Sequence, residues 1–85
     1  AQYRVLERTM ENLYQKQLVV AAKNYNRSAM QYFILNNADI SQKDENGRTP
    51  IFYAVFYIDL AIIKLLLEHG ASVNVKDSQG NTPLD

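Results

Sequence analysis

The sequence lacks most of the residues from which reactive or metal-binding sites are built. It contains no cysteine, which excludes disulfide bridges and thiolate metal ligands. Nine basic and nine acidic side chains cancel, so binding of nucleic acid through release of counterions would gain little. The longest apolar run, residues 51–58, is too short to cross a bilayer, and no signal-peptide pattern opens the chain. These absences leave a single small folded domain.

The polar residues that remain do not combine into a catalytic or metal site. His69 is the only histidine, and without partners beyond Glu68 it cannot form a ligand set. The spacing of Asp39, Asp44 and Asp77 does not form a twelve-residue calcium loop, so turn chemistry explains them better. No glycine-rich phosphate loop is present. We therefore predict no catalytic residue, no metal, no cofactor and no enzymatic activity.

One pattern recurs at a spacing of 33 residues. Residues 44–51, DENGRTPI, return as residues 77–84, DSQGNTPL. Asn46-Gly47 predicts a tight two-residue turn, because glycine adopts positive φ without steric penalty. Thr49 followed by Pro50 predicts a helix start, in which the hydroxyl accepts an otherwise unpaired backbone N–H. A period of this length is typical of stacked supersecondary units.

With Ala54 and the segment LLLEHGASVN at residues 65–74, this pattern resembles the ankyrin repeat. Residues 44–76 match along their whole length. The resemblance implies an all-α solenoid, in which helix-turn-helix units stack and β-hairpin loops join them. It therefore overrides the strand that residues 51–58 would otherwise predict. It also implies an intracellular location, cytoplasmic or nuclear, or delivery into a host cytoplasm if the parent protein is an effector.

The resemblance assigns further roles within residues 44–76. A short helix starts at Thr49-Pro50, and Asp59 caps a second helix near residues 60–69. His69 lies at the exposed last turn of that second helix, where a cation suits the helix dipole. The family usually has glycine at the position of Ile58, so we expect a strained or reshaped turn there.

Residues 18–43 align with the later unit at the same spacing of 33. Asn26 falls on Asp59 as a second cap, and Asn37 falls on Gly70, where asparagine also tolerates a left-handed conformation. The Gly-x-Thr-Pro opening is missing from this first unit. We therefore divide a domain fragment of a larger repeat protein, residues 1–85, into four segments: a capping helix at 1–14, a divergent repeat at 15–43, a full repeat at 44–76 and the start of another at 77–85.

The N-terminal segment is predicted to be helical. Tyr3, Leu6, Met10 and Leu13 form one apolar stripe over residues 3–14. No glycine or proline separates this segment from the next, so the helix either runs on or breaks softly. The stripe could bind a partner helix or a membrane surface, but a helix that covers the first repeat explains it more simply.

Basic residues in the first third of the chain raise a nucleic-acid hypothesis. They lie near Tyr14 and Tyr25, and they are Arg4, Arg8, Lys16, Lys23 and Arg27. We favour a solvated capping segment, because the charge of the whole chain is balanced. We predict neither a nucleic-acid nor a membrane partner.

The resemblance implies a non-enzymatic protein–protein interaction module that binds another protein on its concave face. Hairpin tips and the exposed side of the first helix of each unit form that face. The residues that it places there are Lys23, Asn24, Glu45, Asn46, Arg48, Phe52, Phe56, Tyr57, Ser78, Gln79 and Asn81. Phe56 and Tyr57 are the candidate anchors, and the alternative is that one or both pack back between the helices.

Two further hypotheses remain open. The chain could be a spacer or folding cap in a larger effector or enzyme whose activity lies outside it. It could also self-associate through the apolar face near residues 65–67, at the C-terminal end of the stack. The fold hosts many roles, so the pattern alone does not decide among these hypotheses.

Overall fold

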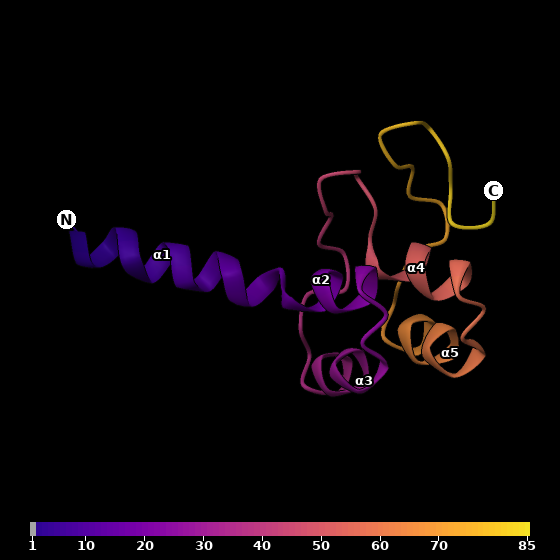
Figure 1. Ribbon diagram of the computed structural model, residues 1–85, viewed down its shortest axis with the longest axis horizontal. Coiled ribbons are helices and arrows are strands. Elements are labelled where there is room, and N and C mark those ends of the chain that lie inside the picture. Colours follow the sequence, from indigo (N-terminus) through magenta and orange to yellow (C-terminus); the bar gives the residue numbers. More distant parts are fainter. Residues whose placement is uncertain (1) are drawn as a thin grey trace.

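Two helix pairs follow one another along the chain, preceded by a single longer helix. The computed structural model describes residues 2–85, with the side chains of 2, 3, 9, 11, 12, 14 and 15 left undescribed. The five helices are α1 (Gln2–Gln15), α2 (Gln17–Lys23), α3 (Arg27–Leu35), α4 (Pro50–Phe56) and α5 (Leu60–Glu68) (Figure 1). No residue from 2 to 85 lies in a strand, and residues 51–56 are helical. The all-α prediction is confirmed.

The two helix pairs stack so that like helices are neighbours. α2 contacts α3 and α4, while α5 contacts α3 and α4, which gives an inner row of α2 and α4 and an outer row of α3 and α5. Their shared core consists of side chains that are at most 2% exposed: Leu18, Val19, Ala22, Met30, Ile34, Ile51, Ala54, Ile62 and Leu66. Burial of this apolar surface is the main force that joins the pairs.

The predicted ends of the outer helices are confirmed. Asn26 accepts a hydrogen bond from the backbone N–H of Ala29 at 3.2 Å, and Asp59 accepts one from Ile62 at 3.2 Å. Asn37 and Gly70, which follow α3 and α5, have φ values of 62° and 91°. The period of 33 therefore holds for cap chemistry and for backbone conformation.

The expected capping role of Thr49 is wrong in its detail. Thr49 does precede α4, with Pro50 at the first helical position, but its side chain makes no capping hydrogen bond. The Phe52 N–H instead donates to the backbone carbonyl of Thr49 at 3.1 Å. Because proline contributes no N–H, the first turn has one donor fewer to satisfy.

The two hairpin loops are wider than the predicted two-residue turn. We call residues 44–48 the first tip and residues 77–81 the second tip. In the first tip, the Asp44 N–H donates to Arg48 O at 2.9 Å and the Gly47 N–H donates to Asp44 O at 3.0 Å. Three residues therefore form the loop, with Gly47 at φ 74°. This is a turn followed by a left-handed residue, a common three-residue hairpin loop.

Ile58 occupies a backbone conformation that suits glycine. Its φ is 55°, and its side chain is 74% exposed, so no burial offsets the strain. A left-handed conformation costs an L-residue about 1–2 kcal/mol, and a β-branched side chain is an unusual occupant of it. The expectation of a strained turn between α4 and α5 is met.

Replacing Ile58 by glycine is expected to stabilise the chain by about 0.5–1 kcal/mol. Release of the strain exceeds the extra entropy that glycine gives the unfolded chain. The measurement is thermal unfolding, where the midpoint should rise by about 3–6 °C. Tyr25→Gly is the matched control, because Tyr25 has a similar φ of 48° but makes contacts that glycine would remove. An Ile58→Gly protein that unfolds at a lower temperature would contradict the strain.

α1 does not cover the first helix pair, contrary to the expected capping role. It is helical as predicted, but it projects away from the stack along the direction of α2 (Figure 1). Leu6, Met10 and Leu13 are 62%, 69% and 61% exposed. Lys16, which joins α1 to α2, keeps helical dihedrals of φ −86° and ψ −5°. The second of the two alternatives left open by the sequence, a soft break, therefore occurs at Lys16, and the two helices stay nearly in line.

Candidate functional site

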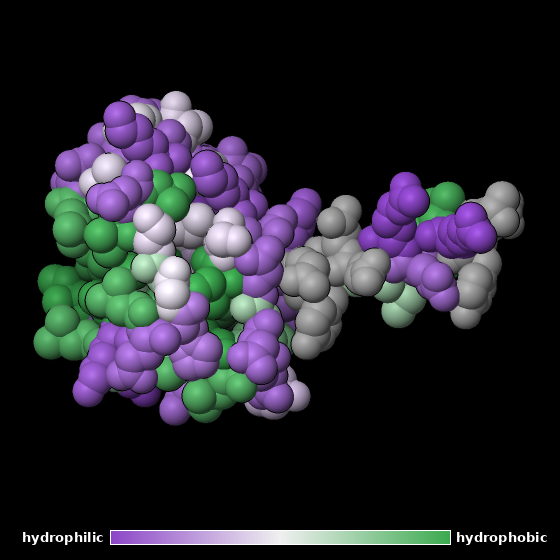
Figure 2. Space-filling view, turned by 180° about the vertical axis from the view of Figure 1, so that it is seen from behind, coloured by the Kyte–Doolittle hydropathy of each residue, from purple (hydrophilic) through white to green (hydrophobic). Residues whose placement is uncertain are grey.

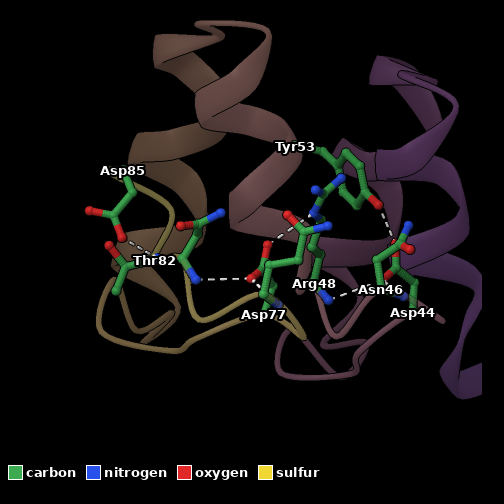
Figure 3. A network of polar contacts seen from close by, with 9 residues as sticks. Asp44, Asn46, Arg48, Tyr53, Asp77, Thr82 and Asp85 are labelled. Carbon is green, nitrogen blue, oxygen red and sulfur yellow. Dashed lines mark hydrogen bonds and ion pairs between the residues drawn. The ribbon is translucent and has the colours of Figure 1, made fainter.

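Each tip is organised by one aspartate. In the first tip, Asp44 accepts hydrogen bonds from the backbone N–H groups of Asn46 at 2.9 Å and Arg48 at 3.0 Å. The Tyr53 hydroxyl, from α4, donates to the other carboxylate oxygen of Asp44 (Figure 3). The first tip is therefore fixed both internally and to the inner row of helices.

The second tip repeats this arrangement and is joined to the first. Asp77 accepts from the backbone N–H groups of Gln79 and Asn81, each at 2.9 Å. Arg48 reaches across from the first tip, with its Nε 3.3 Å from Asp77 Oδ2 (Figure 3). The backbone N–H of Ser78 also donates to Asn46 O at 3.0 Å. One ion pair and one backbone hydrogen bond thus tie the tips together.

Hydrogen bonding to these aspartates shifts their pKa values. The Asn81 and Gln79 backbone N–H groups lower the pKa of Asp77 below 3.8. Burial alone would raise the pKa of Asp44, but the Tyr53 hydroxyl and the Arg48 N–H outweigh it, so the pKa is lowered. Each carboxylate is held in its charged form by the donors around it.

Acid is therefore expected to destabilise the chain through the tips. A lowered folded-state pKa gives stability that is present above the unfolded value of 3.8 and is lost as pH falls through the folded value. The free energy of unfolding in urea should be constant down to about pH 5 and decline steadily between about pH 4 and pH 2. Asp44→Asn should flatten that decline, and an equally steep decline in this variant would refute the assignment.

A third aspartate links the two helix pairs. Asp59 is 8% exposed, and its Oδ2 accepts hydrogen bonds from the Tyr25 hydroxyl at 2.9 Å and from Arg27 Nε at 2.8 Å. Burial alone would raise the pKa of Asp59, but Arg27, the Ile62 N–H and the Tyr25 hydroxyl outweigh it, so the pKa is lowered. The capping role of Asp59 was predictable from the sequence, whereas its partners in the preceding unit, Tyr25 and Arg27, were not.

Three aromatic rings run across the turns between inner and outer helices. Tyr25 and Tyr57 are stacked, with ring centroids 4.3 Å apart and an angle of 19°. Phe56 meets Tyr57 edge-on at 5.2 Å and 88°. Phe56 is 75% exposed and Tyr57 is 41% exposed. Tyr57 thus packs on Tyr25, and Phe56, which contacts Tyr57 edge-on, keeps most of its surface exposed.

Most of the residues predicted for the concave face are solvent-accessible, and Phe52 is the exception. Phe52 is only 8% exposed, so its expected place on an accessible rim is wrong. It lies on the side of α4 that faces residues 82–85. The exposed or partly exposed members are Lys23, Asn24, Glu45, Asn46, Arg48, Phe56, Tyr57, Ser78, Gln79 and Asn81.

A groove lies between α4 and residues 77–85. Its volume is about 460 Å³, and Arg48, Phe52, Phe56, Asn81 and Leu84 are among its lining residues. The groove thus has aromatic and aliphatic walls beside the charged contact between the tips. Lys23 at the end of α2 pairs with Glu45 of the first tip, which extends the polar edge toward the first helix pair.

The described residues offer little for metal or phosphate chemistry. No group of three potential metal ligands occurs among them. His69 caps α5 with its Nδ1 2.9 Å from Leu65 O, as expected for the exposed last turn. None of the five helices combines the length and apolar character that a membrane crossing requires.

The end of the stack formed by α4 and α5 is apolar. Met30 and Ile34 of α3 are fully buried beneath the second pair, whereas their equivalents 33 residues later are Ile63, partly exposed, and Leu67, 47% exposed. Apolar side chains gather at this end, and hydrophilic ones cover the tips (Figure 2). Of the face near residues 65–67, Leu66 is itself fully buried, so self-association there stays a prediction that depends on Leu67.

Comparisons with known proteins agree with this geometry. A family model described as ankyrin repeats (3 copies) matches residues 18–85. The chain is 46% identical over 66 residues to ankyrin repeat protein FPV233 of fowlpox virus, which covers 75% of the chain and 13% of that protein. It is 28% identical over 86 residues to an ankyrin repeat protein of Rickettsia bellii, covering 94% and 51%.

A third relative carries an enzyme name. The chain is 40% identical over 52 residues to the palmitoyltransferase AKR2 of Saccharomyces uvarum, which covers 58% of the chain and 7% of that protein. The chain spans about half the length of the Rickettsia protein and much less of the other two. The paired helices, the repeated caps and tips, and the match over residues 18–85 lead to one conclusion: the chain belongs to the ankyrin-repeat family.

Proposed function

We propose that this chain is a protein–protein interaction module that binds its partner with the two tips and the aromatic ridge beside them. The chain belongs to the ankyrin-repeat family, whose members are generally interaction modules that bind other proteins, and this supports the proposal. The observation that carries the proposal is Phe56, which is 75% exposed beside an ordered polar edge. A large exposed aromatic ring next to fixed polar groups is a typical binding anchor.

The tips are ordered before any partner binds. Asp44 and Asp77 each accept two backbone N–H groups of their own tip, and Arg48 pairs with Asp77. A partner would therefore not have to immobilise these loops. Since the ordering of loops opposes association, a preformed edge keeps more of the contact energy for affinity.

The groove beside α4 offers a place for apolar side chains of the partner. Phe52, Phe56 and Leu84 all line it. Arg48 and the Lys23–Glu45 pair border the same surface. Charges at a rim act mainly on association rate and specificity, so we assign affinity to the aromatic ring and orientation to the charges.

Phe56→Ala tests this proposal. Proteins retained by the immobilised chain should bind the variant at least about 30-fold more weakly, as expected for a hot spot worth about 2 kcal/mol. Tyr32→Ala is the matched control, because Tyr32 is 63% exposed on α3, in the outer row. Its retention should equal that of the unaltered chain.

The stability of both variants is measured alongside, by thermal unfolding. Phe56 has little burial to lose, so the midpoint should move by no more than about 2 °C. Equal retention of all bound proteins by Phe56→Ala and Tyr32→Ala would refute the proposed surface. Loss of binding by Tyr32→Ala alone would move the site to the outer row.

A further inference from the structure

α1 and α2 together form a long rod with one uncovered side. Val20 N–H donates to Lys16 O at 3.0 Å across the junction, and the helical dihedrals of Lys16 keep the two helices nearly in line. Figure 1 shows α1 continuing outward from α2, away from α3, α4 and α5. The rod is thus joined to the stack only at its α2 end.

The exposed side of this rod follows a heptad pattern. Leu6, Met10, Leu13, Gln17 and Val20 are separated by intervals of four, three, four and three residues. All five are exposed, and Leu6, Leu13 and Val20 are 62%, 61% and 52% exposed. A repeat of this spacing on a helix is the pattern that pairs helices by knobs-into-holes packing.

The stripe ends in a groove on the first helix pair. This groove has a volume of about 570 Å³ and is lined by Leu13, Val20, Ala29 and Phe33 among others. Val20 is the equivalent, 33 residues earlier, of Tyr53, which is only 8% exposed. The groove is therefore the surface at which a further helix would normally pack on this fold.

Only the last turn of α1, at Leu13, reaches this groove in the same chain. Leu6 and Val20 are fourteen residues apart, which is about 21 Å along a straight helix. Folding back would require the helical conformation at Lys16 to be lost. Leu6, which we expect to fill the groove, and Val20, which lines it, thus lie at opposite ends of one rod.

We propose that two copies of this chain pair through their α1–α2 rods, antiparallel, with the two-fold axis at Leu13. Leu6 and Val20 are equally distant in sequence from Leu13, seven residues on each side. In this register Leu6 of each copy packs against Val20 of the partner subunit, and Leu13 packs against its own counterpart. Each α1 then covers the groove of the other copy, and the contact is isologous and closed.

Charge favours the antiparallel arrangement over the parallel one. A parallel pair would place the two Lys16 side chains at the same level beside the stripe. In the antiparallel register they are separated by six residues, about 9 Å along the axis. The same register places Glu7, six residues before Leu13, level with Val19, six residues after it, so no two like charges meet at the edge of the stripe. The parallel pair would also press the two stacks against each other, whereas the antiparallel pair keeps them at opposite ends.

The first test is the mass of the 85-residue chain in solution. Light scattering after size-exclusion chromatography should give twice 9.8 kDa at high concentration and a shift toward 9.8 kDa on dilution. Leu6→Lys and Val20→Lys should each raise the dimer dissociation constant at least tenfold. The matched controls are Val5→Lys on α1 and Leu35→Lys on α3, which change side chains of 64% and 56% exposure outside the stripe. A 9.8 kDa species at every concentration would overturn the proposal.

The second test fixes the direction of the pair. Because the chain has no cysteine, any disulfide must come from introduced residues. Leu13→Cys should form a disulfide-linked dimer on mild oxidation. Leu6→Cys should not, because its two copies lie about 21 Å apart along the axis and a disulfide needs Cα atoms within about 7 Å. Rapid cross-linking of Leu6→Cys to itself would establish a parallel pair and overturn the proposal.

The third test separates two copies from one folded-back chain. The double variant Leu6→Cys, Val20→Cys should oxidise to a covalent dimer. An oxidised monomer with no free thiol would mean that α1 folds onto its own groove, which overturns the proposal. None of these measurements depends on Phe56 or the tips. The pairing of two copies can therefore fail while the proposed partner surface holds, and the reverse.

Discussion

Asp59→Ala is expected to lower the free energy of unfolding by about 2–3 kcal/mol. The substitution removes the cap of α5, which alone is worth about 1 kcal/mol. It also removes the shared acceptor of Tyr25 and Arg27, and so breaks the polar link between the two helix pairs. The expected loss of stability is not larger, because Arg27 is half exposed and water can solvate its charge after the substitution.

Two variants separate the cap from the link. Asp59→Asn retains an acceptor for the Ile62 N–H but loses the charge that Arg27 faces, so it should cost about 1 kcal/mol. Asn26→Ala removes the equivalent cap of α3, the acceptor of the Ala29 N–H, and should also cost about 1 kcal/mol. Urea unfolding measures all three proteins. An Asp59→Ala cost no greater than that of Asn26→Ala would show that the link contributes nothing.

Gly47→Ala is expected to cost about 2–3 kcal/mol, more than the same change at the equivalent Gly80. A Cβ at residue 47 would lie 2.9 Å from the backbone nitrogen of Ser78 and 3.3 Å from Asp77 C. Those atoms are backbone, so relief requires the two tips to move apart. The φ of 74° adds the usual left-handed penalty of about 1 kcal/mol for a residue with a Cβ.

Gly80→Ala supplies the control because its conformation is the same and its surroundings are open. Its φ is 81°, and a Cβ there would meet no atom within 4 Å. Only the conformational penalty of about 1 kcal/mol should remain. Hydrogen exchange at Ser78 N–H should accelerate in Gly47→Ala alone, since that N–H bonds to Asn46 O. Equal costs for the two variants would contradict the close approach of the tips.

The repeat made much of this architecture predictable from sequence. A spacing of 33 carries backbone requirements as well as residue types, so Asn26 and Asp59 were recognisable as caps and Asn37 as a left-handed position. The same reasoning rejected a strand at residues 51–58. The division of the chain at residues 15, 44 and 77 stays a prediction.

Other features depended on contacts between units, which a single unit does not encode. The partners of Asp59 lie in the preceding pair, and the pairing of Arg48 with Asp77 needs both tips in place. The role of Tyr25 could have been suspected from its position, one residue before the cap Asn26 and two residues before Arg27. Phe52 was predicted to be accessible but is only 8% exposed, because it lies on the side of α4 that faces residues 82–85.

The direction of α1 was also beyond the sequence argument. An apolar stripe shows that a face requires burial, but it does not identify what buries it. Leu6, Met10 and Leu13 fit a cap on the same chain and a pair between chains equally well. The dihedral angles of Lys16 exclude the cap on the same chain, because they keep α1 in line with α2, and the pair between chains stays a proposal.

The two rows of helices give the stack a mechanical property. α2 and α4 meet along one edge and α3 and α5 along the other, while the tips continue the first edge outward. Any change that shortens the edge formed by one row of helices, and leaves the other row unchanged, must bend the stack toward the shortened edge. A ligand that pulls residues 46 and 78 closer would therefore curl the solenoid, and one that wedges between them would flatten it.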